Sequence, residues 1–165
     1  MQHQIKTIDA NILVDYFLSD KLDRDRRSSI TKFFQPSNTG DTKIRIFVYT
    51  LGEVFKRVLG TRDGITVNLF DYRRQESLEK LQGWISSNFI SIVRLDDISS
   101  DFFDHYKCID KSDSLIQKGD KIALAAFCAD MESKAFYSID THIIGSIKVQ
   151  SYIHSIDKSK TIREP

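Results

Sequence analysis

Short hydrophobic runs alternate with longer amphipathic segments along the whole chain. The runs are rich in Ile, Val, Phe and Tyr, which is typical of β-strands. They are Ile5–Ile8, Ile44–Tyr49, Ile90–Leu95, Ala135–Ile139 and Val149–Ile153. The intervening segments predict helices at Ala10–Leu18, Ser28–Phe34, Leu51–Leu59, Leu69–Ser86, Phe102–Cys108 and Lys121–Met131, with a short turn of helix over Thr141–Lys148. Strands separated by helices need crossover connections, so the pattern predicts a parallel sheet with helices on both faces.

Polar segments and helix breakers divide this pattern. Loops are expected at 36–40 and 60–64, and within the polar segment 111–120. At 165 residues the chain is long enough to bury one core without disulfides or metals. We therefore expect a single domain over residues 1–155, followed by a charged, frayed tail at 156–165.

Composition and charge exclude several classes of protein. Hydrophobic residues make up 41% of the chain, which argues against wholesale disorder. The longest apolar run, Ile122–Ala129, is too short to span a membrane, so we expect a soluble cytoplasmic protein. Cys108 and Cys128 form no CxxC motif and predict neither a disulfide framework nor a zinc site. Net charge is +1, and the basic clusters at 24–27 and 73–74 are interpreted as solvated helix faces.

Four acidic residues stand where a functional site is expected in an open α/β sheet, beyond the carboxyl ends of the strands. Asp9 and Asp140 each follow a predicted strand, and Glu53 lies one helical turn after another. Asp120 begins the most apolar predicted helix. If the first, second and fourth strands are neighbours, the four carboxylates meet at one edge of the sheet.

Each acid also has a local structural explanation. Asp9, Asp120 and Asp140 each precede a helical segment, and Asp is a preferred N-cap. Thr50 and Glu53 match a capping box. The set is harder to explain in this way, because two like charges at 4 Å repel by roughly 4 kcal/mol at an effective dielectric near 20. Such a group needs a counter-charge, and Mg²⁺ or Mn²⁺ takes oxygen ligands of this kind.

The acidic motifs, taken in order, resemble those of the PIN domain. They are "IDANILVDYF", the Glu of "YTLGEVFKRV", "GDKIALAA" and "YSIDTHI", and the similarity runs from Ile5 to about Ile153. The resemblance implies a three-layer α/β/α sandwich on a central parallel sheet of about five strands. It also implies Asp9, Glu53, Asp120 and Asp140 as catalytic residues and ligands of Mg²⁺ or Mn²⁺.

Two polar residues match supporting positions of the family. The resemblance gives Asn11 and Ser138 the role of holding a carboxylate or a water in place, and Ser138 shares a side of its strand with Asp140 because strand side chains alternate. Two features depart from the pattern. The region 60–119 is longer than in the smallest toxin-like members, and His142 stands where many relatives carry a basic or acidic residue.

The function implied by the resemblance is metal-dependent hydrolysis of RNA phosphodiester bonds, as in VapC-type toxins. The resemblance also implies an RNA substrate, an antitoxin-like protein partner and a homodimer. The alternative is a non-catalytic PIN-like subunit that binds RNA or acts as a scaffold. A phosphatase of the haloacid dehalogenase type would need Asp-x-Asp where this chain has Asp9-x-Asn11, and a response-regulator receiver would need an acidic pair there.

Overall fold

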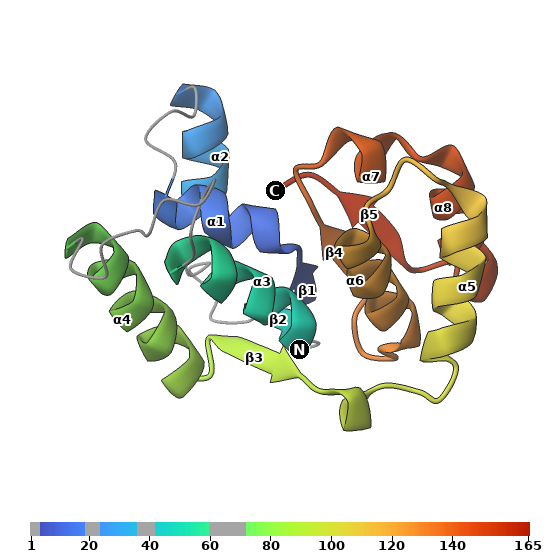
Figure 1. The fold of residues 1–165 in the computed structure, drawn as a ribbon, viewed down its shortest axis with the longest axis horizontal. Helices are drawn as coiled ribbons and strands as arrows, with labels where there is room; N and C mark the ends of the chain where they lie inside the picture. The colour runs from blue at the N-terminus through green and yellow to red at the C-terminus, as the bar shows by residue number, and fades with distance from the viewer. Residues whose placement is uncertain (1–3, 19–23, 36–41, 60–71) are drawn as a thin grey trace.

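The computed structural model describes residues 4–18, 24–35, 42–59 and 72–165 (Figure 1). Its strands form one sheet in the order β3-β2-β1-β4-β5, and every neighbouring pair is parallel. Their bounds are β1 Gln4–Ile8, β2 Thr42–Phe47, β3 Ile90–Val93, β4 Ala135–Tyr137 and β5 Thr161–Arg163. The expected neighbourhood of the first, second and fourth strands is therefore confirmed.

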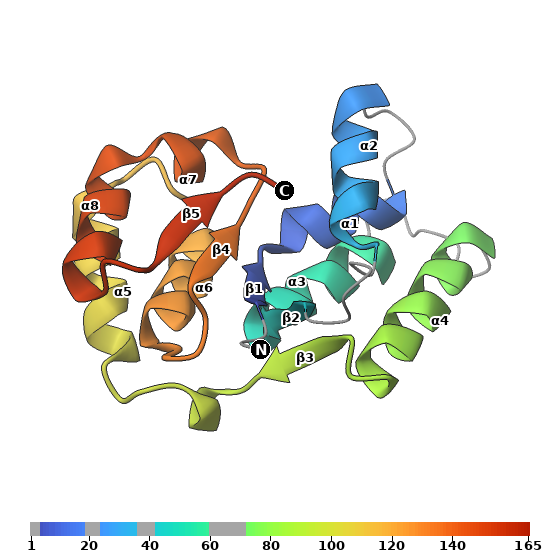
Figure 2. The ribbon, with the colours of Figure 1, turned by 180° about the vertical axis from the view of Figure 1, so that it is seen from behind.

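Helices cover both faces of this sheet (Figure 1, Figure 2). They are α1 Ala10–Leu18, α2 Arg24–Phe33, α3 Val48–Leu59, α4 Tyr72–Ser86, α5 Phe102–Ser112, α6 Lys118–Ala129, α7 Thr141–Gly145 and α8 Ile147–Ile156, with a 3₁₀ turn η1 at Leu95–Asp97. One hydrophobic core joins the sheet to α1, α2, α3 and α4, and a second joins it to α5, α6, α7 and α8. The fold is thus a three-layer α/β/α sandwich, as predicted.

Strand β4 shows how the sequence supplies both cores. Ala135 and Tyr137 contribute to the core under α1–α4, whereas Phe136 contributes to the core under α5–α8. This division follows from the two-residue period of a strand. Helix α6 is buried over most of its length, as its apolar sequence indicates.

The fifth predicted strand, Val149–Ile153, is wrong, because these residues lie inside helix α8. Ser146 caps this helix and accepts a hydrogen bond from the backbone N–H of Val149. Val149 and Ile153 are both buried, one helical turn apart. Their spacing has the helical period, although the β-branched and aromatic residues of this segment also favour a strand.

The predicted frayed tail at 156–165 is also wrong, because Thr161–Arg163 forms the edge strand β5 beside β4. Lys160 is buried just before this strand, and its Nζ donates to the carbonyl oxygens of Phe127 and Asp130. These bonds attach the segment to the end of α6. The tail is therefore an ordered part of the sheet.

The remaining differences concern element boundaries. The strands predicted over Ile44–Tyr49, Ile90–Leu95 and Ala135–Ile139 each end two residues earlier, at Phe47, Val93 and Tyr137. The expected loops at 36–40 and 60–64 lie outside the described residues. Among the residues that the structure describes, no helix is long and apolar enough to cross a membrane.

Candidate active site

Asp9 lies directly after β1 and is 1% exposed. Its backbone N–H donates to the carbonyl oxygen of Tyr137 at 2.9 Å, which joins it to the end of β4. The carboxylate accepts two hydrogen bonds, from the Ala10 N–H to Oδ1 at 2.7 Å and from Ser138 Oγ to Oδ2 at 2.9 Å. Asp9 is therefore a buried carboxylate held in one orientation from two sides.

Ser138 connects the two strand ends. Besides donating to Asp9, its Oγ accepts from the Asp140 N–H at 3.0 Å and from Asn11 Nδ2 at 3.4 Å. The structure therefore places Asn11 and Ser138 beside Asp9, although Asn11 contacts the serine. The Asn11 Oδ1 is buried and accepts no hydrogen bond from the part of the chain that the structure describes.

Asp140 is the N-cap of α7, where its Oδ1 accepts from the His142 N–H at 2.7 Å. The cap expected from the sequence is thus present, and it leaves the second carboxylate oxygen for other contacts. His142 contributes its backbone to this cap. The capping box expected for Thr50 and Glu53 is wrong, because α3 begins earlier, at Val48.

Glu53 and Asp120 come from two helices that approach one another closely. Asp120 lies in the first turn of α6, whose N-cap is Gln117, so Asp120 is inside the helix and does not cap it. A Cβ placed on Gly119 would lie 2.5 Å from Glu53 Oε1. The absence of a side chain at Gly119 therefore provides the space that the Glu53 carboxylate occupies.

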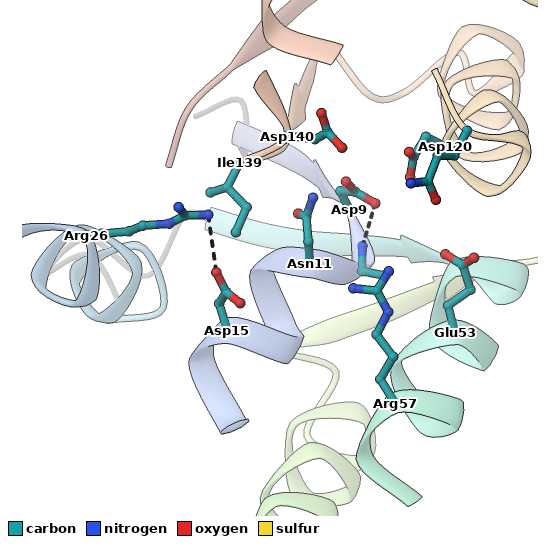
Figure 3. A pocket seen from close by; sticks show the side chains of 11 residues that line it. Asp9, Asn11, Asp15, Arg26, Glu53, Arg57, Asp120, Ile139 and Asp140 are labelled. Atoms are coloured by element: carbon teal, nitrogen blue, oxygen red, sulfur yellow. Dashed lines mark hydrogen bonds and ion pairs between the residues drawn. The ribbon is translucent and has the colours of Figure 1, made fainter. Parts of the chain in front are cut away.

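All four predicted acids line one cavity of about 250 Å³ (Figure 3). They enter it from the end of β1, from α3, from the first turn of α6 and from the start of α7. Asn11 lines the cavity as well. Ser138 is not part of the lining, but its hydroxyl donates a hydrogen bond to Asp9, which is. The sequence pattern thus predicts four of the five acids that line the cavity, and the fifth is Asp15.

The acidic side chains influence one another across this cavity. Burial raises the pKa of Asp9 to about 6, helped by the charges of Glu53 and Asp140 and opposed by the bonds from Ser138 and Ala10. The pKa of Asp120 is raised to about 7, first by burial and then by the charges of the neighbouring acids. Strongly shifted carboxyl groups in a cavity are typical of functional sites.

Four polar residues of the cavity were not predicted from the sequence: Asp15, Arg26, Arg57 and Gln117. Arg26 belongs to the basic cluster interpreted as a solvated face, and it forms an ion pair with Asp15 at 3.3 Å. Arg57 lies four residues after Glu53 on α3. That spacing puts both on one helix face and is a signal that could have identified Arg57.

The donor chemistry of the cavity suits a hard cation. Its candidate ligands are carboxylate oxygens together with the unpaired amide oxygen of Asn11, the oxygen donors that Mg²⁺ and Mn²⁺ prefer. Across the described ranges, however, no group of three or more His, Cys, Asp or Glu side chains lies close enough together to hold one ion. The cavity therefore suits Mg²⁺ or Mn²⁺ by the chemistry of its donor atoms, and not by the distances between its carboxylates.

Comparisons with known proteins add no family to this description. No protein-family model matches the chain, and no curated protein matches its sequence. The PIN-domain resemblance accordingly stays a prediction.

Proposed function

We propose that this chain is a Mg²⁺- or Mn²⁺-dependent endoribonuclease of the PIN type that hydrolyses RNA phosphodiester bonds in the cavity of Figure 3. One observation carries the proposal: acids from four separate segments line a single cavity, and one of them, Asp9, is almost fully buried. Burying a carboxylate beside other carboxylates destabilises a fold. Such an arrangement is expected where the carboxylates bind a ligand or take part in a reaction.

The cavity residues have separate roles in this proposal. Asp9, Glu53, Asp120 and Asp140 would hold the cation. When bound, such an ion acidifies water and neutralises the charge that develops on a phosphodiester during hydrolysis. The Ala10 N–H and the Ser138 hydroxyl keep the Asp9 carboxylate oriented. The unpaired Asn11 Oδ1 is available to accept a hydrogen bond from water.

The second candidate is a non-catalytic PIN-like subunit that binds RNA or acts as a scaffold. One observation favours it, namely that the described acids do not converge as a group of three on one ion position. The retention of all four acids favours the enzyme. A toxin role, an antitoxin-like partner and a homodimer stay predictions of the resemblance.

Cleavage of end-labelled single-stranded RNA tests the proposal, with Mn²⁺, Mg²⁺ or EDTA present. Asp9→Asn and Asp140→Asn are compared with wild type and with Asp104→Asn, an exposed acid of α5 that pairs with Lys107 on the same helix. We expect metal-dependent cleavage by wild type and Asp104→Asn. The two site variants should lose at least the ~10- to 100-fold typical of groups that only orient metal ligands.

Folding is checked separately by thermal melting. Asp9→Asn keeps the shape of the side chain and removes a buried charge, so its melting temperature should not fall. Cleavage that survives in both site variants would overturn the nuclease proposal and favour the scaffold.

A further inference from the structure

The charges of the cavity raise the question of how an anionic substrate enters it. Among the described residues, the lining includes the carboxylates of Asp9, Asp15, Glu53, Asp120 and Asp140, and the guanidinium groups of Arg26 and Arg57. An RNA phosphate would meet this excess of negative charge even with one divalent ion bound. The guanidinium groups of the cavity are therefore the side chains suited to contact that phosphate.

The two arginines differ in whether they form an ion pair. Arg26 reaches Asp15 at 3.3 Å, so its charge is already compensated within the wall of the cavity. Arg57 makes no hydrogen bond or ion pair with any residue in the described ranges. Of the two, Arg57 is the guanidinium available to a ligand.

The position of Arg57 matches that role. It lies one helical turn beyond Glu53 on α3, and its side chain is exposed. Figure 3 shows it extending from α3 toward the space between Asp9 and Glu53. A substrate group bound next to these two carboxylates would therefore meet the guanidinium.

A purely structural role explains Arg57 less well. Burial and the neighbouring acids raise the pKa of Asp120, and Arg57 is the charge that lowers it. Yet no carboxylate among the described residues lies within ion-pair distance of Arg57. A residue retained only to balance these acids would be expected to contact one of them, as Arg26 does. The guanidinium instead lines the cavity without such a contact, and its planar set of donors is suited to phosphate oxygens.

We propose that Arg57 binds a non-bridging phosphate oxygen of single-stranded RNA in the acidic cavity and is a further substrate-binding residue of this site. The inference rests on the proposed function. It adds to the predicted acids a cationic contact at a residue to which the sequence analysis gives no role.

Salt dependence of RNA binding provides the sharpest test, because each phosphate contact on a single strand contributes about 0.7 to the slope of log K against log salt. The probe is a short fluorescein-labelled single-stranded RNA, and its binding is followed by anisotropy. The protein carries Asp9→Asn so that the probe stays intact. Arg57→Gln is compared with Lys56→Gln, which removes the same charge from the neighbouring exposed position on α3.

We expect Arg57→Gln to weaken binding and to lower the slope by about 0.7, while Lys56→Gln leaves the slope unchanged. A methylphosphonate, which is uncharged, is then introduced at each phosphate of the probe in turn. At the contacted phosphate it should weaken binding to the parent protein and have little further effect on Arg57→Gln, as in a double-mutant cycle. Equal slopes for the two glutamine variants would overturn the inference.

A cleavage assay separates failure of this inference from failure of the proposed function. In the otherwise wild-type protein, Arg57→Gln should lower kcat/KM by about tenfold or more, and Arg57→Lys should restore part of it. Metal-dependent cleavage with unchanged salt slopes would overturn the Arg57 contact and leave the nuclease standing. A reduced slope in a protein without metal-dependent cleavage would support the contact and overturn the nuclease.

Discussion

Gly119 controls the space in which the Glu53 carboxylate lies. The 2.5 Å separation between a Cβ at this position and Glu53 Oε1 is too short for an ordinary contact. The atom that must move is the end of a flexible side chain, so the backbone can stay in place. A methyl group here should therefore displace one candidate ligand and leave the fold intact.

We predict that Gly119→Ala separates activity from stability. The free energy of unfolding should stay the same or rise slightly, because Ala is favoured over Gly in a helix by about 0.5–1 kcal/mol. RNA cleavage and Mn²⁺ affinity should each fall by about tenfold or more, since Glu53 is moved. The measurements are urea denaturation, RNA cleavage and Mn²⁺ titration.

The matched control is Gly83→Ala in α4, where a Cβ would meet nothing within 4 Å. It should stabilise the protein in the same way without changing cleavage. Equal cleavage by the two alanine variants would show that the position of Glu53 has no bearing on the reaction.

At the scale of residues, the sequence predicts four of the five acids that line the cavity and misses Asp15 and the two arginines. Asp9 and Asp140 are recognisable because each follows a predicted strand, and Ser138 is predicted from its match to the PIN-domain motif. Arg26 and Arg57 are not, because charged residues on helices usually face water. The packing of α2 and α3 is what places both arginines in the lining of one cavity.

At the scale of elements, the two wrong assignments of structure lie near the end of the chain, at Val149–Ile153 and at 156–165. The segment around Val149 has β-branched residues at helical spacing, and the cap that decides its structure, Ser146, precedes the hydrophobic run. Strand β5 is three residues long and surrounded by charged residues, so no run of apolar residues marks it. Its position depends on Lys160, a residue type that is rarely buried.

We predict that Lys160→Met lowers the free energy of unfolding by about 1–3 kcal/mol. The substitution keeps most of the apolar stem and removes the ammonium group, which leaves the carbonyl oxygens of Phe127 and Asp130 buried without their donor. Urea denaturation measures the effect. Lys158→Met, two residues earlier and exposed, should change stability by no more than about 0.5 kcal/mol. Equal stability of the two variants would contradict a structural role for the buried ammonium.

At the scale of the whole molecule, the strand order assembles the site. Because β1 is central and lies between β2 and β4, the segments that follow these three strands meet at one edge. Helix α6, which packs on the other face of the sheet from α1 and α3, then brings Asp120 to the same edge. That these segments lie together at one edge of the sheet is predictable from the alternation of strands and helices. The separations between the carboxylates are not, because they depend on side-chain packing that no sequence pattern specifies.

The raised pKa values of Asp9 and Asp120 make the stability of the molecule depend on pH. An unfolded Asp titrates near 3.9, whereas these two titrate at about 6 and about 7 in the folded chain. Between about pH 4 and pH 7 these two groups thus bind more protons in the folded state than in the unfolded state, and their contribution to stability falls as pH rises. His105, whose pKa is lowered by burial, acts in the opposite sense, so the wild-type profile alone does not isolate the two acids.

The comparison with Asp120→Asn isolates the larger of the two contributions. In EDTA we expect the variant to lose less stability than wild type between about pH 5 and pH 8, because Asn does not ionise. Mn²⁺ should raise the melting temperature of wild type more at the higher pH, where the carboxylates are free of protons. Parallel pH profiles for the two proteins would contradict the raised pKa of Asp120. A shift by Mn²⁺ that is equal in both proteins would place the bound ion away from that carboxylate.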